Sequence, residues 1–369
     1  MTRKLFLFFG LSLCTALVAG DHKVPQSQLY VIENESPHSK TVIDGLKKCD
    51  INFTVVDSVN DDSDALYIIC DISKTDHLPQ NYIAYQSLDL SKGNIASAYL
   101  EKLSNAIAVW DYNLNNIARY QSRVAHYYYF PTECEYIDPI FLVCALPKTA
   151  LSRYRDLLAY SNRKNTDISS HLPALFCYGI LQCPKIIVEA GVRGGESTIP
   201  FKEVAAKCNS QLIGIDIEVD VNSAYAGLQK GTFLRMNDLA FASYYEKSQF
   251  RNEKIDMVFI DTSHQYEHTL AEIQMFAPML SKNGMIIFHD SNVTPLDKGT
   301  AYIRLNYTKG QALGNTRGVT RALKEYFAIE FDEHSYLNFK FPKGEITWRM
   351  IHYPFCNGLT IVQKVDKNL

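Results

Sequence analysis

The sequence predicts an α/β protein with a parallel sheet that carries helices on both faces, preceded by a smaller α/β domain. Two observations predict this class. In the first third of the chain, short apolar runs alternate with helical patterns. In the second half, the apolar run Ile186–Val188 is followed by Gly191, Gly194 and Gly195 and then by a helical pattern. This is typical of a buried parallel strand followed by a glycine turn that a ligand can approach closely.

Length and composition are those of a globular protein with two domains. The chain has 369 residues, of which 47% are hydrophobic and 21% are charged, and its formal net charge is −3. This charge provides no basic surface for nucleic acid, so we expect no nucleic-acid partner and chemistry on a small molecule or glycan acceptor. A homo-oligomer is left open.

The first twenty residues differ from the rest. Arg3 and Lys4 precede the apolar run Leu5–Val18, and small residues follow before the polar chain resumes. Residues 1–20 are therefore predicted to be a signal peptide, with a membrane anchor as the alternative. We therefore expect the protein to be exported or membrane-anchored, or cytoplasmic if the leader is not used. Contact with a membrane is expected only through an uncleaved leader.

The cysteines show no regular disulfide framework. An even number of the nine remains once the leader is removed, which is compatible with disulfides in an exported protein. Cys70, Cys144, Cys177 and Cys183 lie in apolar runs, and we predict that they are buried thiols outside any disulfide. No Cys or His spacing indicates a zinc site.

The first domain is predicted over residues 21–150 and a helical connector over 151–165. Alternating strands and helices indicate a small parallel sheet. The strands are expected at Leu29–Ile32, Phe53–Val56, Ala65–Cys70 and Tyr82–Tyr85, and the helices at Lys40–Lys48 and Ala96–Asn105.

Part of this domain carries recognisable motifs. The segments Asn81–Gln86, Ala108–Asn113 and Tyr127–Pro131 resemble the N-terminal half of bacterial GT-B glycosyltransferases. The second nucleotide-binding half of such enzymes does not follow, so the resemblance implies an acceptor-recognition or scaffolding domain without sugar transfer. The alternative for Trp110 and Asp111 is simple packing and capping.

The second domain is predicted over residues 166–369 and contains the glycine turn. From Gly191 the next glycines fall at +3 and +4, whereas a dinucleotide site requires +2 and +5. An acid at a strand end before a loose glycine turn instead resembles the first motif of class I S-adenosylmethionine (SAM) methyltransferases, which have a Rossmann-like sheet. The resemblance implies that SAM contacts Glu189, Ala190 and the glycines Gly191, Gly194 and Gly195.

The next strands also end in polar residues. Asp216 ends the apolar run Gln211–Asp216, about twenty residues beyond the turn, where a carboxylate suits the ribose hydroxyls; Glu218 is the alternate. Asn237 and Asp238 lie where the resemblance implies contact with adenine.

Two further apolar runs carry the most specific motif. One ends in Asp261, with His264 three residues later, and the other ends in His289–Asp290. Together they resemble a methyltransferase family that includes proteins called cephalosporin hydroxylases and is similar to the sugar O-methyltransferases of macrolide biosynthesis, over about residues 170–365. A helix at Thr269–Leu280 and a late strand at Gly358–Gln363 complete the expected domain, and the polar segment Asp297–Gly318 is a candidate lid.

The motif predicts a catalytic site. Asp261, His289 and Asp290 are the predicted ligands of Mg²⁺, or of Mn²⁺ because an imidazole is among them. In the resembled sugar enzymes the residue three after the strand-end aspartate is a general base, which here is His264. Those enzymes have Glu-Asp in place of His289–Asp290, and the alternative for His264 and His289 is a structural role.

We therefore expect a SAM-dependent methyltransferase that acts on oxygen of a sugar or a similar polyhydroxylated acceptor, with assistance from a divalent metal. The alternative is a non-catalytic glycan-binding or scaffold protein that keeps the fold.

Overall fold

The structure is a computed structural model that describes residues 28–365 except 34–35, 37–38, 49–50, 61, 63, 87, 89, 91–94, 131–140, 165, 219, 293–317, 336 and 355. The predicted leader and nearly all of the predicted lid lie outside the described residues. Within the described part of the chain, we find no helix that combines the length and apolar character needed to span a membrane.

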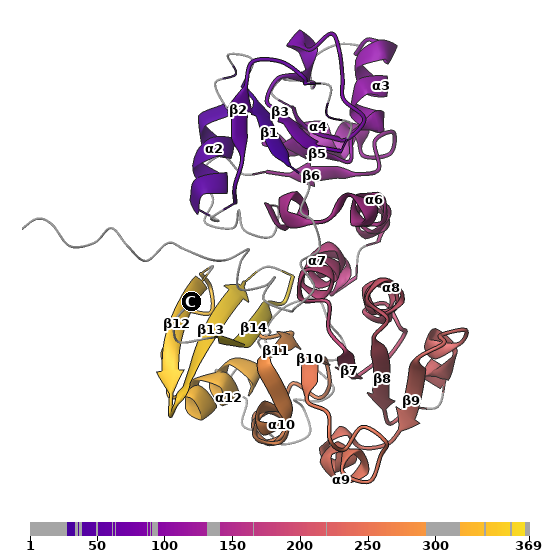
Figure 1. The fold of residues 1–369 in the computed structure, drawn as a ribbon, viewed down its shortest axis with the longest axis vertical. Helices are drawn as coiled ribbons and strands as arrows, with labels where there is room; N and C mark the ends of the chain where they lie inside the picture. The colour runs from indigo at the N-terminus through magenta and orange to yellow at the C-terminus, as the bar shows by residue number, and fades with distance from the viewer. Residues whose placement is uncertain are drawn as a thin grey trace, which may run out of the picture. The chain divides into compact units, whose positions relative to one another are not determined.

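The chain divides into two compact units between Gln182 and Cys183. The first unit contains a six-stranded parallel sheet with the order β2-β1-β3-β4-β5-β6 (Figure 1). Its strands are β1 (Leu29–Ile32), β2 (Thr54–Val56), β3 (Leu66–Ile69), β4 (Tyr82–Gln86), β5 (Ala108–Asp111) and β6 (Tyr127–Tyr129).

Helices complete the first unit. They are α2 (Ser39–Lys48), η1 (Ile72–Lys74), α3 (Ser97–Asn105), α4 (Leu114–Tyr120), η2 (Leu142–Ala145), α6 (Lys148–Arg163), η3 (Ser169–His171) and α7 (Leu172–Gln182). Helix α7 packs against α6 and buries nearly all of its residues. We assigned α7 to the second domain from the sequence, whereas the compact units group it with the first.

The second unit contains an eight-stranded mixed sheet with the order β12-β13-β14-β11-β10-β7-β8-β9. Five strands are parallel: β7 (Ile186–Ala190), β8 (Gln211–Asp216), β9 (Gly231–Arg235), β10 (Ile255–Ile260) and β11 (Leu280–His289). The antiparallel strands β12 (Leu337–Lys343), β13 (Ile346–Tyr353) and β14 (Leu359–Val365) extend the sheet beyond β11. The predicted α/β class is confirmed, while the β12–β13 hairpin was not predicted.

The helices of this unit are α8 (Thr198–Cys208), η4 (Asp220–Tyr225), η5 (Asp238–Ala240), α9 (Phe241–Tyr245), α10 (Tyr266–Met279) and α12 (Gly318–Phe327). Helices α10 and α12 pack against each other. The strand order reverses at β7, which lies between β8 and β10. In open α/β sheets, ligands bind beyond the carboxyl ends of the strands at such a reversal.

A disulfide joins Cys183, just before β7, to Cys208 at the end of α8. The prediction that Cys183 is a thiol was therefore wrong. The end of α8 lies near the start of β7, which brings Cys208 to Cys183. Cys70, Cys144 and Cys177 are buried thiols, as predicted.

Candidate functional site

The turn after β7 requires glycine because neighbouring backbone approaches closely. Gly191 has a φ of +86°, and a Cβ there would lie 2.0 Å from the carbonyl oxygen of Asp261. Gly195 has a φ of +75°, and its Cβ would lie 2.6 Å from that of Ala224. At Gly194 a Cβ would meet open space. The glycines thus let the ends of β7 and β10 come together and keep one side of the turn accessible.

Glu189 lies beneath this turn and is fully buried. Its carboxylate accepts hydrogen bonds from Ser197 Oγ at 2.6 Å, from Thr198 Oγ1 at 2.9 Å and from the hydroxyl of Tyr225. Burial raises the pKa of Glu189 to about 7, although the three hydroxyl groups partly oppose that shift. The carboxylate therefore joins the start of α8 and the end of η4 to the end of β7.

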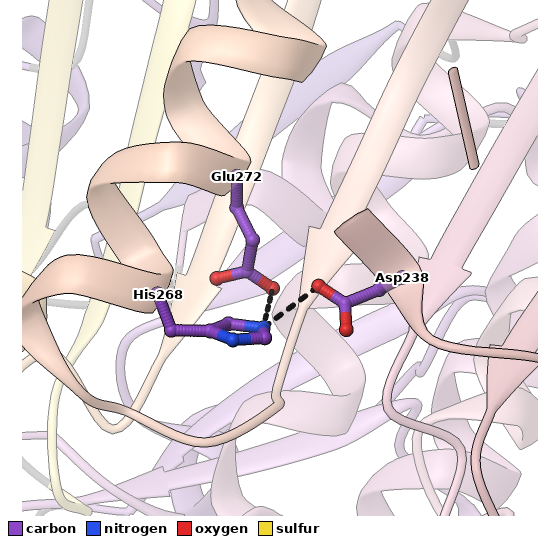
Figure 2. A group of neighbouring side chains, drawn as sticks. All are labelled: Asp238, His268 and Glu272. Carbon is purple, nitrogen blue, oxygen red and sulfur yellow. Dashed lines mark hydrogen bonds and ion pairs between the residues drawn. The ribbon is translucent and has the colours of Figure 1, made fainter. Parts of the chain in front are cut away.

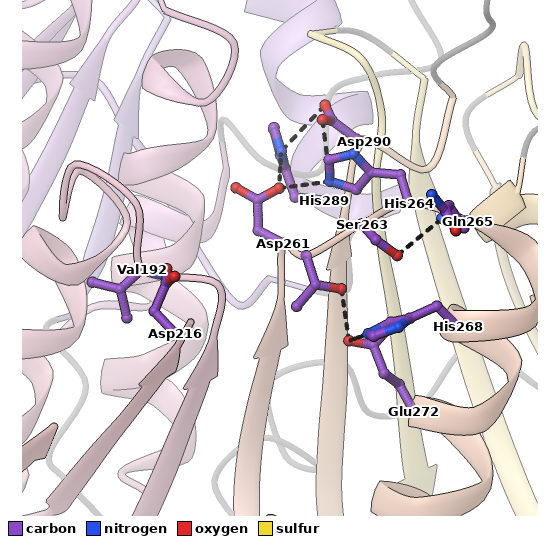
Figure 3. A network of polar contacts seen from close by, with 11 residues as sticks. Val192, Asp216, Asp261, Ser263, His264, Gln265, His268, Glu272, His289 and Asp290 are labelled. Atoms are coloured by element: carbon purple, nitrogen blue, oxygen red, sulfur yellow. Dashed lines mark hydrogen bonds and ion pairs between the residues drawn. The ribbon is translucent and has the colours of Figure 1, made fainter. Parts of the chain in front are cut away.

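Asp216 connects β8 with the same turn (Figure 3). Its Oδ2 accepts hydrogen bonds from the backbone N–H groups of Val192, at 2.8 Å, and Arg193, at 2.9 Å. Its Oδ1 accepts from the N–H of Glu218 at 2.9 Å. Asp216, which is predicted to bind the ribose, thus also orders the turn. The predicted alternate, Glu218, is exposed.

Asn237 is the N-cap and Asp238 the first residue of η5, which follows β9. Asn237 Oδ1 accepts from the N–H of Leu239 at 2.9 Å and so caps this short helix. Asp238 Oδ2 lies 2.8 Å from His268 Nε2 on α10. The predicted adenine contacts are therefore engaged in different ways, one with its own helix and the other with a neighbouring helix.

The four side chains of the most specific motif meet at the ends of β10 and β11 (Figure 3). His264 Nε2 lies 3.0 Å from Asp261 Oδ1 and 3.4 Å from Asp290 Oδ2. His289 Nδ1 lies 3.3 Å from Asp261 Oδ1 and 3.3 Å from Asp290 Oδ1. We call these four residues the strand-end cluster. The predicted base thus lies among the predicted metal ligands.

In the strand-end cluster, the neighbouring charges shift the pKa values in the direction opposite to the effect of burial. Burial alone would raise the pKa of Asp261, but the neighbouring imidazoles of His289 and His264 hold it far below its ordinary value. Burial would likewise lower the pKa of His264, but the charges of Asp290 and Asp261 raise it above the ordinary value. The arrangement favours carboxylates paired with cations at this position.

The backbone of the cluster is strained at two positions. His264 has a φ of +56° and Asp290 a φ of +53°, although neither residue is glycine. Gly318, at the start of α12, approaches so closely that a Cβ there would lie 2.1 Å from the carbonyl oxygen of His264. Residues held in such conformations are typical of functional sites, and here packing against α12 supports the one at His264.

The chemistry of the cluster fits a divalent cation. Ligand atoms of the predicted ligands Asp261 and Asp290 lie within 4.8 Å of each other and of the predicted base His264. The third predicted ligand, His289, has its Nδ1 at 3.3 Å from each of these carboxylates. Two carboxylates and an imidazole form a donor set for Mg²⁺ or, more readily, Mn²⁺.

Several partners of these residues were not predicted. Thr262 Oγ1 donates to Glu272 Oε1 at 2.7 Å, and His268 lies between Asp238 and Glu272. The spacing of four between His268, one residue before the predicted helix, and Glu272 within it was the available signal, because residues four apart share a helix face.

The motif of the first unit forms a structural network. Asp111 accepts hydrogen bonds from the N–H of Asn113 at 2.7 Å, from Asn116 Nδ2 at 3.0 Å and from the hydroxyl of Tyr127 at 2.9 Å. Trp110 is buried and stacks on Phe130 with ring centroids 5.2 Å apart. The geometry agrees with the packing and capping alternative for Trp110 and Asp111.

Comparison with known proteins identifies part of the second unit. Residues 188–291, from within β7 to two residues beyond β11, match a family model described as a methyltransferase domain. This segment of the second unit is therefore similar to a methyltransferase domain, in agreement with the predicted class of enzyme. No curated protein matches the chain.

Solved structures of methyltransferases are also similar to the chain. The O-methyltransferase TomG from Streptomyces achromogenes, in complex with SAM, is 13% identical over 54% of this chain and 81% of its own, with a TM-score of 0.36. The SAH-bound methyltransferase PaMTH1 from Podospora anserina is 12% identical over 60% of this chain and 89% of its own, with a TM-score of 0.40. Similarities this low carry no conclusion about the function of this chain.

Proposed function

We propose that the second unit transfers a methyl group from SAM to a hydroxyl oxygen of a sugar or a similar polyhydroxylated acceptor. The observation that carries this proposal is the strand-end cluster: within a methyltransferase domain, two carboxylates and two imidazoles converge beside the glycine turn. An acid–base cluster at this position suits the deprotonation of an acceptor hydroxyl.

SAM is proposed to bind at the glycine turn. The open side of Gly194 and the partly exposed carboxylate of Asp216 fit a nucleoside with a ribose diol. In the proposed cofactor site Glu189 supports the turn through its hydrogen bonds, Ala190 and the glycines border the cofactor, and Asn237 lies toward adenine.

His264 is the proposed general base. As the acceptor oxygen attacks the sulfonium methyl group, the O–C bond forms, the C–S bond breaks, and the hydroxyl proton passes to Nδ1 of His264, the ring nitrogen that does not pair with the carboxylates. Asp261 and Asp290 orient that imidazole and stabilise its positive charge. Asp261, Asp290 and His289 would hold Mg²⁺ or Mn²⁺, which would lower the pKa of a chelating hydroxyl and orient its oxygen.

The first unit is proposed to recognise the acceptor or to act as a scaffold, without sugar transfer. The complete internal hydrogen bonding of the Asp111 carboxylate supports this assignment. Transfer from UDP-glucose or another sugar nucleotide by the full chain would contradict it.

Calorimetric titration of the full chain with SAM is the test of cofactor binding. We expect Asp216→Ala to weaken SAM binding at least about tenfold, because charge-assisted hydrogen bonds contribute about 1.5–3 kcal/mol each. Glu218→Ala is the matched control, since its side chain is exposed and it should bind SAM nearly as wild type does. Equal affinity of Asp216→Ala and wild type would refute the assignment.

Turnover is tested by radiolabelled methyl transfer from SAM to a panel of monosaccharides and their glycosides. Excess EDTA should abolish transfer while SAM binding remains. Full transfer in EDTA, with His264→Ala still impaired, would leave the base and exclude the metal. SAM binding without transfer to any acceptor would favour the non-catalytic alternative.

A further inference from the structure

A second group of ligand-type side chains lies apart from the strand-end cluster. Asp238 is the first residue of η5, and His268 and Glu272 are one turn apart on α10. His268 Nε2 lies 2.8 Å from Asp238 Oδ2 and 3.7 Å from Glu272 Oε1 (Figure 2). The spacing of four residues places both α10 side chains on one helix face, opposite the carboxylate of η5.

The separations in this second cluster suit a bound cation. One ligand atom from each of the three residues lies within 4.8 Å of the others. Ligands at about 2.0–2.2 Å from a first-row metal ion lie roughly 3–3.5 Å from one another, so only small side-chain movements are needed. One imidazole with two carboxylates is a donor set that admits zinc, cobalt and manganese.

The burial of Glu272 in the second cluster also favours a bound cation. Glu272 is fully buried, and its Oε2 has no hydrogen-bond partner among the described residues. Its Oε1 accepts the hydrogen bond from Thr262 Oγ1 at 2.7 Å. A buried carboxylate oxygen without a partner is costly, and bidentate coordination of a cation would engage it.

Two of the three side chains in the second cluster are partly exposed. The side chains of His268 and Asp238 are 21% and 10% exposed, whereas that of Glu272 is fully buried. The cluster therefore combines two partly exposed ligand-type side chains with one buried carboxylate. A protonated His268 paired with the two carboxylates would also hold the cluster together, but it would leave Glu272 Oε2 without a partner.

We propose that Asp238, His268 and Glu272 bind a divalent transition-metal ion that links η5 to α10. The ion is separate from the one proposed in the strand-end cluster, and its binding does not depend on methyl transfer. This gives the carboxylate of Asp238 a role different from the adenine contact predicted from the sequence.

The proposal is tested with Co²⁺ as the probe, on the full chain stripped of metal. Bound Co²⁺ is counted by equilibrium dialysis, and its coordination is followed by visible absorption. His268→Gln and Glu272→Gln should each lose one equivalent relative to wild type, and near-ultraviolet circular dichroism should show that both variants fold. His77→Gln, which changes an exposed histidine in the first unit, is the matched control and should lose none.

Wild-type stoichiometry in the folded His268→Gln and Glu272→Gln variants would overturn the proposal. A measurement on the wild-type protein keeps the test independent of how the variants fold. In crystals soaked with Co²⁺, an anomalous peak among Asp238, His268 and Glu272 is expected, and its absence at saturating Co²⁺ would refute the site. His264→Gln should leave this peak in place, because it changes only the strand-end cluster.

Discussion

Asp111 and Asp261 both lie at the carboxyl end of a parallel strand, one in each sheet, but their surroundings differ. Asp111 is the last residue of β5, and Asp261 directly follows β10. The donors to Asp111 are a backbone N–H, an amide and a phenol, all neutral, and burial raises its pKa to about 6. Asp261 faces two imidazoles, whose charges outweigh its burial and lower its pKa.

The two aspartates also differ in their exposure to solvent. Asp111 is fully buried, whereas the side chain of Asp261 is 17% exposed. An acid at the end of a parallel strand is thus not by itself a functional signal. The charge of its partners and its access to a ligand separate the structural acid from the candidate catalytic one.

The largest expected effect comes from removing the charge of Asp261. Asp261→Asn should lower kcat by about 10³-fold or more, because it removes a proposed metal ligand and the partner of His264, and metal-assisted charge stabilisation contributes several kcal/mol. Methyl transfer is measured by radiolabel and Mn²⁺ binding by electron paramagnetic resonance. Added Mn²⁺ should partly restore Asp261→Asn.

His264→Ala provides the contrast, since its loss of roughly 10²–10⁴-fold in kcat should not respond to Mn²⁺. Wild-type turnover in Asp261→Asn would place that acid in the same structural class as Asp111.

A buried acid of the second unit resembles Asp111 more than Asp261. Glu189 has hydroxyl partners, and its pKa is raised from an ordinary value of 4.5 to about 7. The folded state therefore holds this proton more tightly than the unfolded state does. Its contribution to stability is greatest below about pH 4.5, decreases on the order of 3 kcal/mol as the pH rises to about 7, and is constant above that.

Glu189→Gln should remove this pH dependence, as measured by urea unfolding between pH 4.5 and 8. The amide can still pair with the hydroxyls of Ser197, Thr198 and Tyr225, which accept as well as donate. Glu246→Gln, at an exposed position, is the matched control and should keep the wild-type profile. An unchanged profile in Glu189→Gln would show that the carboxylate is not desolvated in solution.

The sequence predicted those features that depend on local pattern. Apolar runs with an acid at the end located β7, β8, β10 and β11 and therefore Glu189, Asp216 and Asp261. Partners distant along the chain were not predictable, because they depend on how the elements pack. Tyr225 reaches Glu189 across 36 positions, and Cys183 meets Cys208 across 25.

Competing interpretations account for two other differences. The predicted helix began at Thr269, so it included Glu272 but not His268, and nothing local indicates that Asp238 lies opposite them. The β12–β13 hairpin was missed because several of its strand residues face solvent, and that leaves a weak apolar signal.

The smallest expected effect concerns the network in the first unit. Tyr127→Phe removes one hydroxyl, which donates to Asp111 Oδ2 at 2.9 Å, and otherwise keeps the shape of the ring. Hydrogen bonds to charged groups contribute about 1.5–3 kcal/mol, so the free energy of unfolding of the first unit should fall by about 2 kcal/mol. Methyl transfer and SAM affinity should remain at wild-type values, because Asp111 has a structural role.

Tyr30→Phe, in the same sheet, is the matched control for loss of a hydroxyl group and should change the unfolding free energy less. A fall in turnover with unchanged stability in Tyr127→Phe would instead assign the Asp111 network to catalysis and remove the contrast between the two strand ends.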